Sequence, residues 1–471
     1  MKKRVNRGLV FVMVLMLSLV NFSASKQISQ PEIIVGPYTQ NVSNDSITIV
    51  WETSMPTSNN SVEYGENKSY GYIKYGLHST NHHEITINPP FSSGHYRVIS
   101  DGIKSNDFKF KLASYCHTTK KFKCVIFGDS RGTWDNWKHA KEVANAVNAE
   151  HPDIVIHGGD MVAYGESRQQ WDSWLELMKP LMQNSTVFGV LGNHERNGSR
   201  YYEIFALPNN EMWYSFDYGP CHFTILDEYE SWNINSPQYE WLENDLSSSM
   251  APFKIVCFHE PIYCSGGHAP RNDVKKVWEP LFNKYNVNLI FQSHNHYYQR
   301  TNPINGITYI VTGGAGAPLY EPTKAWFVNN SKKAYHYCVL DVSLDKMEIK
   351  CSAKYINGTT FDEFVVFISA PNVKIIKPEK ALYVFNKKII PLPSPLIIGK
   401  IDIEAYASDY KSGIERVEFY IDDELRYTDN DSPYSWTWDE FAFGAHEIAV
   451  RAHNNNGDYA NSKMEVMILN I

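Results

Sequence analysis

Five short apolar segments of this chain each end in side chains that bind metal ions, and this recurrence constrains the fold more than any other feature. The segments are rich in branched and aromatic residues, as buried strands are. The residues that follow them are Asp129, Asp160, Asn193 with His194, His259, and His294 with His296. Strand carboxyl ends gather at one edge of an α/β sheet, where sites form, so we expect these side chains to lie together. Taken alone, His294 and His296 also fit two loop histidines that are hydrogen-bonded or solvent-facing and bind no metal. The metal-binding residue types at the ends of the other four segments favour a metal site.

Helical segments alternate with these strands. The sequence predicts helices over 136–150, 171–179, 238–246 and 273–285. Strands that alternate with helices form a parallel or mixed sheet with the helices outside it. We therefore predict a central α/β domain over residues 120–369, with mixed sheets flanked by helices.

Both flanks of this domain have short strands without helices. Turn clusters separate runs of alternating apolar and polar residues from 31 to 112 and again from 401 onward, which is typical of antiparallel β-sandwiches. We predict one sandwich over 30–115 and a second within 370–471, with the proline-bearing stretch after Ala370 as a linker. In the second sandwich, Trp436 and Trp438 fit either exposed binding residues or the core.

Composition excludes several classes of protein. A chain of 471 residues with 43% hydrophobic and 14% aromatic residues is not generally disordered. Its net charge of -8 and the lack of a basic block after the first residues argue against binding nucleic acid through a basic surface. Seven cysteines are too few for a disulfide scaffold. Cys338 and Cys351 are the one pair that we expect to face each other on neighbouring strands.

The first 25 residues have the pattern of a secretory signal peptide. Four cations precede an apolar run over 9–20, and small residues follow it at a suitable distance for cleavage. The apolar run is shorter than the ~20 residues that a membrane-spanning helix needs. We expect a protein that is secreted or held at the cell surface, without a transmembrane helix in the mature chain.

The ligand types at the strand ends indicate which metals fit. Carboxylate, amide oxygen and imidazole together suit Zn, Mn or Fe, whereas thiolate-preferring metals would require cysteine. A carboxylate that bridges two ions ~3.5–4 Å apart makes a hydrolytic centre, which lowers the pKa of a bound water and stabilises a phosphoryl transition state.

These motifs resemble those of the calcineurin-like metallophosphoesterases, in particular the purple acid phosphatase branch. The five ordered motifs are Gly128-Asp129, Gly159-Asp160, Gly192-Asn-His-Glu195, Val256-x-x-His259 and Ser293-His-Asn-His296. The resemblance covers about 121–369. The first sandwich is similar to the fibronectin type III-like domain that precedes such enzymes, and the last resembles bacterial immunoglobulin-like modules.

The resemblance implies a role for each motif residue. The first of two ions, which are Fe, Zn or Mn, would be bound by Asp129, Asp160 and His296, and the second by Asp160, Asn193, His259 and His294. His194 would protonate the leaving alkoxide or orient the phosphate, a role that suits an imidazole. His268 is similar to a further substrate-contacting histidine, although a loop histidine is also commonly only solvated.

Three residues depart from the family pattern. The purple enzymes have a metal-binding tyrosine three residues after the bridging aspartate, where this chain has Ala163. Arg131 replaces the glycine of the first motif, and both a bidentate contact to a substrate phosphate and a solvent-facing position fit it. Ser293 replaces a glycine before the last motif, a change between small residues.

The resemblance implies an enzyme, namely an exported dinuclear phosphatase that hydrolyses phosphomonoesters by attack of a metal-bound hydroxide. Two alternatives remain open. The same core would serve a phosphodiesterase or nucleotidase, and a surface or glycan-binding protein with a relic phosphatase domain would use its sandwiches instead. The complete ligand set argues against a relic. For the C-terminal sandwich we expect a role in spacing or in attachment to the cell surface or a glycan.

Overall fold

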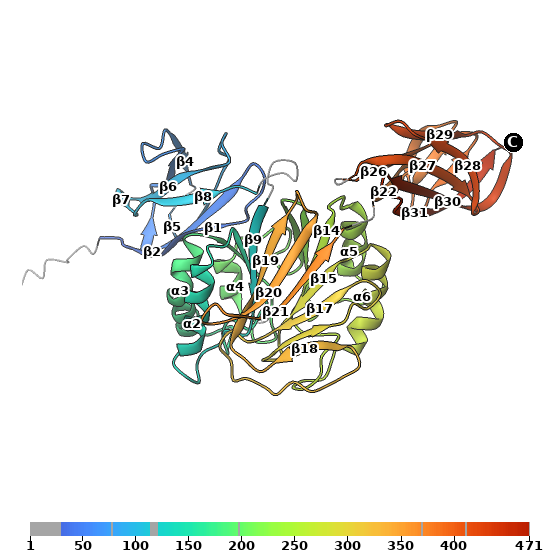
Figure 1. Ribbon diagram of the computed structural model, residues 1–471. Coiled ribbons are helices and arrows are strands. Elements are labelled where there is room, and N and C mark those ends of the chain that lie inside the picture. Colours follow the sequence, from blue (N-terminus) through green and yellow to red (C-terminus); the bar gives the residue numbers. More distant parts are fainter. Residues whose placement is uncertain are drawn as a thin grey trace, which may run out of the picture.

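The computed structural model describes residues 30–76, 79–113, 121–195, 198–368, 371–409 and 412–470. The predicted signal peptide lies outside these residues. A β-rich N-terminal part, a central α/β part and a C-terminal β part follow one another along the chain (Figure 1). This order confirms the predicted fold class.

The first sheet of the central part has six strands. Strands β9, β10 and β11 are parallel, and β19 continues the sheet antiparallel to β9. In spatial order the strands are β11 (Thr186–Gly189), β10 (Ile154–His157), β9 (Lys121–Phe127), β19 (His336–Ser343), β20 (Glu348–Tyr355) and β21 (Thr360–Phe367). Strands from both ends of the central segment therefore complete one sheet.

The second sheet of the central part has seven strands. Its centre is parallel, because β13, β14, β15 and β17 run in one direction. In spatial order the strands are β12 (Tyr214–Tyr218), β13 (Cys221–Ile225), β14 (Phe253–Cys257), β15 (Leu289–Gln292), β17 (Thr308–Thr312), β16 (Tyr298–Thr301) and β18 (Val328–Lys332).

Helices lie on the two outer sides of the central part (Figure 1). Buried side chains of α2 and α3, such as Val143 and Trp174, join the core of the first sheet, whereas Leu242 of α5 and Trp278 of α6 join that of the second. The helices are α2 (Lys138–Ala149), α3 (Arg168–Met182), α4 (Ser199–Ile204), α5 (Pro237–Ser248) and α6 (Asn272–Lys284). None of the helices in the described part of the chain has the length and apolar character that crossing a membrane requires.

The N-terminal part consists of two antiparallel sheets over a core that contains Trp51 and Tyr96. One sheet has β1 (Ile33–Gln40), β2 (Ile47–Thr57) and β5 (Thr80–Ile87), and the other has β3 (Asn60–Gly65), β4 (Tyr72–Tyr75), β6 (Ser93–Ser100), β7 (Ile103–Lys104) and β8 (Phe108–Lys111). It packs on the central part, where the Tyr38 hydroxyl donates to the Ile204 carbonyl at 2.8 Å.

The C-terminal part corrects one prediction and decides between two alternatives for its tryptophans. The stretch expected to be a linker forms strands of the sandwich, and the prediction was wrong because Pro391 is tolerated at the end of an edge strand. Trp438 is buried and Trp436 packs against the same core, so neither is an exposed binding residue. The sheets are β22 (Asn372–Lys377), β26 (Ile401–Ser408) and β29 (Tyr434–Trp438), and β24 (Lys387–Pro391), β23 (Ala381–Val384), β25 (Leu396–Ile398), β31 (Tyr459–Asn470), β30 (Ala442–Asn454), β27 (Ile414–Ile421) and β28 (Glu424–Asp429).

The expected pairing of Cys338 with Cys351 is wrong. Both lie on neighbouring strands, but the residue opposite Cys351 is Leu340 and the residue opposite Cys338 is Ala353. The two cysteines are therefore diagonal neighbours. Residues in diagonal positions on neighbouring strands are about 7–8 Å apart, which is too far for a disulfide. All six cysteines that the structure describes are free and buried.

Candidate metal centre

Loops at the carboxyl ends of β9, β10, β11, β14 and β15 carry the predicted ligands. Three of these residues, Asp129, Asp160 and His294, have positive φ angles of 62°, 55° and 61°. Side chains other than glycine seldom adopt this left-handed region, and such strain persists only where the surroundings enforce it. The backbone thus turns sharply at each of these strand ends and presents the side chain toward the loops of the neighbouring strands.

Two glycines allow the loops to approach one another. Gly159 has φ +93°, and a Cβ there would lie 2.6 Å from the Nδ1 atom of His259. A Cβ on Gly192 would lie 2.3 Å from the Oδ1 atom of Asp160. Both distances are far below van der Waals contact, so any larger residue would push the loops apart.

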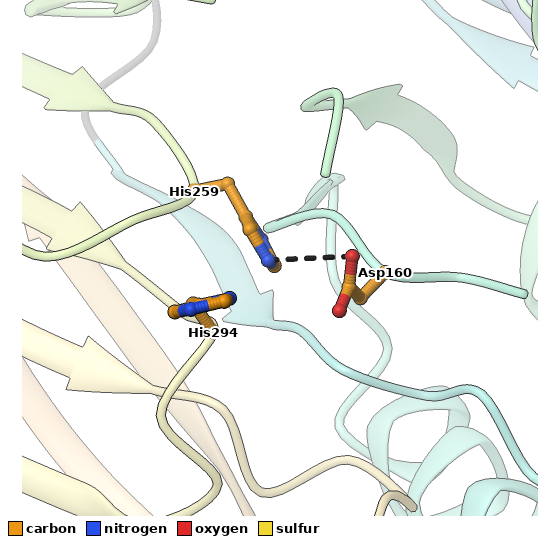
Figure 2. A group of neighbouring side chains, drawn as sticks. All are labelled: Asp160, His259 and His294. Carbon is orange, nitrogen blue, oxygen red and sulfur yellow. Dashed lines mark ion pairs between the residues drawn. The ribbon is translucent and has the colours of Figure 1, made fainter. Parts of the chain in front are cut away.

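Asp160, His259 and His294 form one half of the centre, and Asn193 lies in the chain between Gly192 and His194, which both approach Asp160. The ligand atoms of Asp160, His259 and His294 all lie within 4.8 Å of one another, and the side chains point toward a common space (Figure 2). The Nε2 atom of His259 is 3.3 Å from Oδ1 of Asp160. Burial opposes the ionisation of Asp160, but its histidine neighbours and Arg131 hold the pKa of its carboxyl below the usual range.

Hydrogen bonds orient the histidines for metal binding. The Nδ1–H group of His259 donates to the Gly158 carbonyl at 2.7 Å, and that of His296 to the Pro318 carbonyl at 2.7 Å. A carbonyl can only accept, so each ring has its Nε2 lone pair directed into the centre. Burial, aided by His259, lowers the pKa of His294 to about 2, and the neutral imidazole is the form that binds a metal.

The other half of the centre contains Asp129, His296 and the shared Asp160. The Nε2 atom of His296 is 3.3 Å from Oδ1 of Asp129, and the second oxygen of Asp129 accepts the His294 backbone N–H at 2.8 Å. Arg131 also reaches this half. Its Nη2 donates to Nε2 of His296 at 3.1 Å, and its Nε is 3.6 Å from Oδ2 of Asp160.

Unpartnered ligand atoms test whether this donor set fits metal ions. Buried polar atoms are nearly always hydrogen-bonded. Within the ranges that the structure describes, one buried side-chain atom of each of five predicted ligands has no hydrogen-bond partner: Asp129 Oδ1, Asp160 Oδ2, Asn193 Oδ1, His259 Nε2 and His294 Nδ1. Oxygen and imidazole nitrogen are the donors that Zn, Mn and Fe accept. The residues therefore fit bound metal, and the six predicted ligands lie on neighbouring loops.

The three remaining predicted site residues surround this centre. His194 donates from Nδ1 to the Ala163 carbonyl at 2.7 Å, and its Nε2 lies 3.6 Å from Oδ2 of Asp160 and in contact with Arg131. The ring of His268 is 4.4 Å from that of His294 between centroids. Arg131 is 9% exposed, which excludes the solvent-facing alternative.

Four supporting residues were not predicted from the sequence. Buried Glu195 accepts the backbone N–H groups of Asp160 at 2.8 Å, Gly192 at 3.1 Å and Val162 at 3.1 Å. The others are Glu228, which accepts the N–H of His259, Asn295, which bonds the His268 backbone twice, and Tyr320, which stacks on His296. The position of Glu195 directly after Asn193 and His194 was the one available signal.

The position of the family's tyrosine has no aromatic side chain facing the centre. Ala163 is buried and its carbonyl orients His194, while Tyr164 is 70% exposed. The departure seen in the sequence is therefore not compensated by the neighbouring tyrosine.

Comparison with known proteins defines the class. Residues 122–298 match the model of the calcineurin-like phosphoesterases, and residues 371–457 match that of a bacterial Ig domain. The central domain is a calcineurin-like phosphoesterase domain, which supports an enzyme of the metallophosphoesterase class.

The similar proteins of known name include acid phosphatases, most of them purple acid phosphatases. The chain is 27% identical to acid phosphatase type 7 of Mus musculus over 60% of this chain and 78% of that protein. It is 32% identical to purple acid phosphatase 13 of Arabidopsis thaliana, over 31% of each chain. The structure of purple acid phosphatase PPD1 from yellow lupin shares the fold, with a TM-score of 0.64 and 19% identity over 72% of this chain and 74% of that one. The chain thus resembles purple acid phosphatases, although it spans only about a third of that Arabidopsis relative.

Proposed function

We propose that the protein is an exported phosphatase that hydrolyses phosphomonoesters at a centre of two metal ions, which are Zn, Mn or Fe. The convergence of unpartnered ligand atoms around Asp160 carries this proposal. The names of the acid phosphatase relatives support the reaction, and the predicted signal peptide supports the export.

The proposed ligand sets share Asp160. One ion would be held by Asp129, Asp160 and His296, and the other by Asp160, Asn193, His259 and His294. Bound ions would supply Lewis acidity, which lowers the pKa of water and offsets charge on the phosphoryl group. The buried, hydrogen-bonded ligands would keep both positions fixed while the substrate binds.

The remaining side chains act on the substrate in this proposal. His194 is outside the ligand sets and has Nε2 directed at the centre, so it would hold or deliver a proton to the leaving oxygen. Arg131 and His268 would bind phosphate oxygens, because a guanidinium and an imidazole are donors suited to an anion. Each role requires a phosphate next to Asp160.

Hydrolysis assays with metal-stripped protein test the proposal. The mature protein is reloaded separately with Zn, Mn and Fe and assayed on a chromogenic phosphomonoester and the matching diester. We expect metal-dependent monoester turnover, a loss of at least ~100-fold in Asp160→Asn, and no change in Asp341→Asn, which alters an exposed carboxylate of the same domain.

The outcomes separate the alternatives. Faster turnover of the diester than of the monoester would identify the protein as a phosphodiesterase and contradict the proposed phosphatase activity. Metal binding without turnover of either ester, together with binding to cell-wall glycans, would favour a surface protein over an enzyme. The C-terminal sandwich would then have a role in attachment.

A further inference from the structure

Arg131 distinguishes the two halves of the metal centre. Its guanidinium contacts His296, which lies beside Asp129, and also Asp160 and His194. The half that contains Asn193, His259 and His294 instead offers a nitrogen or oxygen on each side chain that is unpartnered within the described ranges. The two halves therefore differ in their histidines: Nε2 of His296 is engaged by Arg131, whereas His259 and His294 each have a ring nitrogen without a hydrogen-bond partner in the described ranges.

The contact with His296 uses the nitrogen that a metal ion would need. Nδ1 of His296 donates to Pro318, so Nε2 is its remaining acceptor, and Arg131 donates to that atom. An imidazole nitrogen has a single lone pair in the ring plane and cannot serve a guanidinium and a metal ion at the same time. The Nε atom of Arg131 also lies 3.6 Å from Asp160 Oδ2, so its positive charge faces the carboxylate that both ions would share.

The guanidinium cannot relieve this competition by losing its proton, because arginine stays charged in proteins. Its position is also constrained: the Arg131 backbone N–H donates to the Asp160 carbonyl at 3.1 Å, and its guanidinium carbon lies 5.6 Å from the ring of Trp134. Like charges in a buried site repel strongly. An ion beside Asp129 must therefore displace the guanidinium from His296 and Asp160.

We propose that Arg131 makes the two metal positions unequal. A divalent cation binds tightly to Asp160, Asn193, His259 and His294, whereas a second binds weakly beside Asp129 and His296 because it competes with Arg131. Displaced from these ligands, the guanidinium is free to bind a phosphate oxygen. The inference rests on the proposed function. It implies that the second position, and with it the complete two-metal centre, forms only when enough free metal is present.

Metal binding tests the inference without an activity assay. The purified full chain is stripped, titrated with Zn²⁺ by calorimetry, and analysed for retained metal by mass spectrometry after desalting. We expect two classes of site in the wild type, with one ion retained. In Arg131→Met, which removes the charge and keeps much of the apolar stem, the weaker site tightens by about 10- to 100-fold, the range for residues around metal ligands, and two ions are retained. Arg426→Met in the C-terminal sandwich is the control and should match the wild type.

Electron paramagnetic resonance of the wild type gives a measurement that does not depend on the folding of a variant. With one equivalent of Mn²⁺ we expect the spectrum of isolated ions, because the tight position fills first. Spin-coupled pairs at one equivalent would overturn the inference, as would two tight sites in the wild type or weaker metal binding in folded Arg131→Met. No Zn²⁺ or Mn²⁺ binding by the wild type would overturn both the inference and the proposed function.

Discussion

His194 differs from the six ligands in what its nitrogens contact. Its Nδ1–H is engaged by the Ala163 carbonyl, which leaves Nε2 as the nitrogen that can exchange a proton with a substrate. Its backbone N–H also donates to Asp160 at 3.2 Å, so the ring is tied to the centre. These contacts place His194 beside the proposed ligands without making it one of them, as its proposed role as a proton donor requires.

Replacing His194 with alanine should reveal that role. We expect His194→Ala to retain its metal and to lose about 10²- to 10⁴-fold in turnover of alkyl phosphates, because their leaving oxygen requires a proton. Aryl phosphates with acidic leaving groups should lose much less. Rates across a series of leaving groups, with metal content measured in parallel, check this expectation. An equal loss for all esters would instead indicate that His194 binds phosphate.

The residue types in the sequence indicated the candidate metal ligands, but not the residues that hold those ligands in place. The six ligands could be named because five strands of one domain that each end in a carboxylate, an amide or an imidazole seldom arise from packing alone. Glu195 and Tyr320 were missed because their roles depend on contacts with backbone N–H groups and with a ring, which many residues of these types make elsewhere.

The loop after β10 packs closely against the loops after β11 and β14. Gly159 lies where these three loops meet, at φ +93° and with His259 and Gly192 adjacent. A glycine is needed there both for the backbone angle and for the space.

Gly159→Ala should therefore break the centre, whereas Gly358→Ala should not. Gly358 has a similar φ of +81° but no atom within 4 Å of the added Cβ. We expect each variant to lose about 1–2 kcal/mol of stability from backbone strain, and only Gly159→Ala to lose metal as well. Thermal unfolding and metal analysis of both variants check this. Full metal content in Gly159→Ala would mean that the loops can move apart without cost.

A charged cluster around the buried Glu52 joins the N-terminal and central parts of the molecule. Glu52 of β2 accepts from Arg200 of α4 at 2.5 Å, and His82 and Arg168 lie 3.6 and 3.5 Å from its oxygens. We call these four residues the Glu52 cluster. Burial opposes ionisation of Glu52, but the neighbouring His82 and Arg200 lower its pKa from 4.5 to about 2. Burial also opposes the charge on His82, but the neighbouring carboxylates of Glu52 and Glu84 raise its pKa from 6.5 to about 9.

These shifts predict how stability depends on pH. A lowered carboxyl pKa stabilises the fold above pH 4.5, and this contribution is lost as the pH falls toward 2; a raised histidine pKa stabilises it below pH 6.5, and this is lost as the pH rises through 9. The Glu52 cluster should thus contribute most between these limits. Glu52→Gln leaves Arg200 buried with a weaker partner, and should cost about 3 kcal/mol in that window.

Urea unfolding at several pH values checks this expectation. The wild type should lose stability on both sides of the window, and Glu52→Gln should flatten the dependence. Glu63→Gln, which breaks the half-exposed pair with Arg97 inside the N-terminal part, is the control and should cost under about 1 kcal/mol. An equal cost for both variants would show that the Glu52 cluster does not stabilise the junction.

The sequence alone determined the order of the three parts and the strands that end in carboxylate, amide or imidazole side chains, and its resemblance to a family pointed to the six residues proposed as ligands. Apolar periodicity and the residue types at strand ends are local properties that can be read without coordinates. Only the tertiary structure decided that β19, far along the chain, pairs with β9, that the cysteines are diagonal, and that Arg131 points inward at His296. These features depend on strand register and on which side chains share a buried space, and both are set by contacts between residues distant in the sequence.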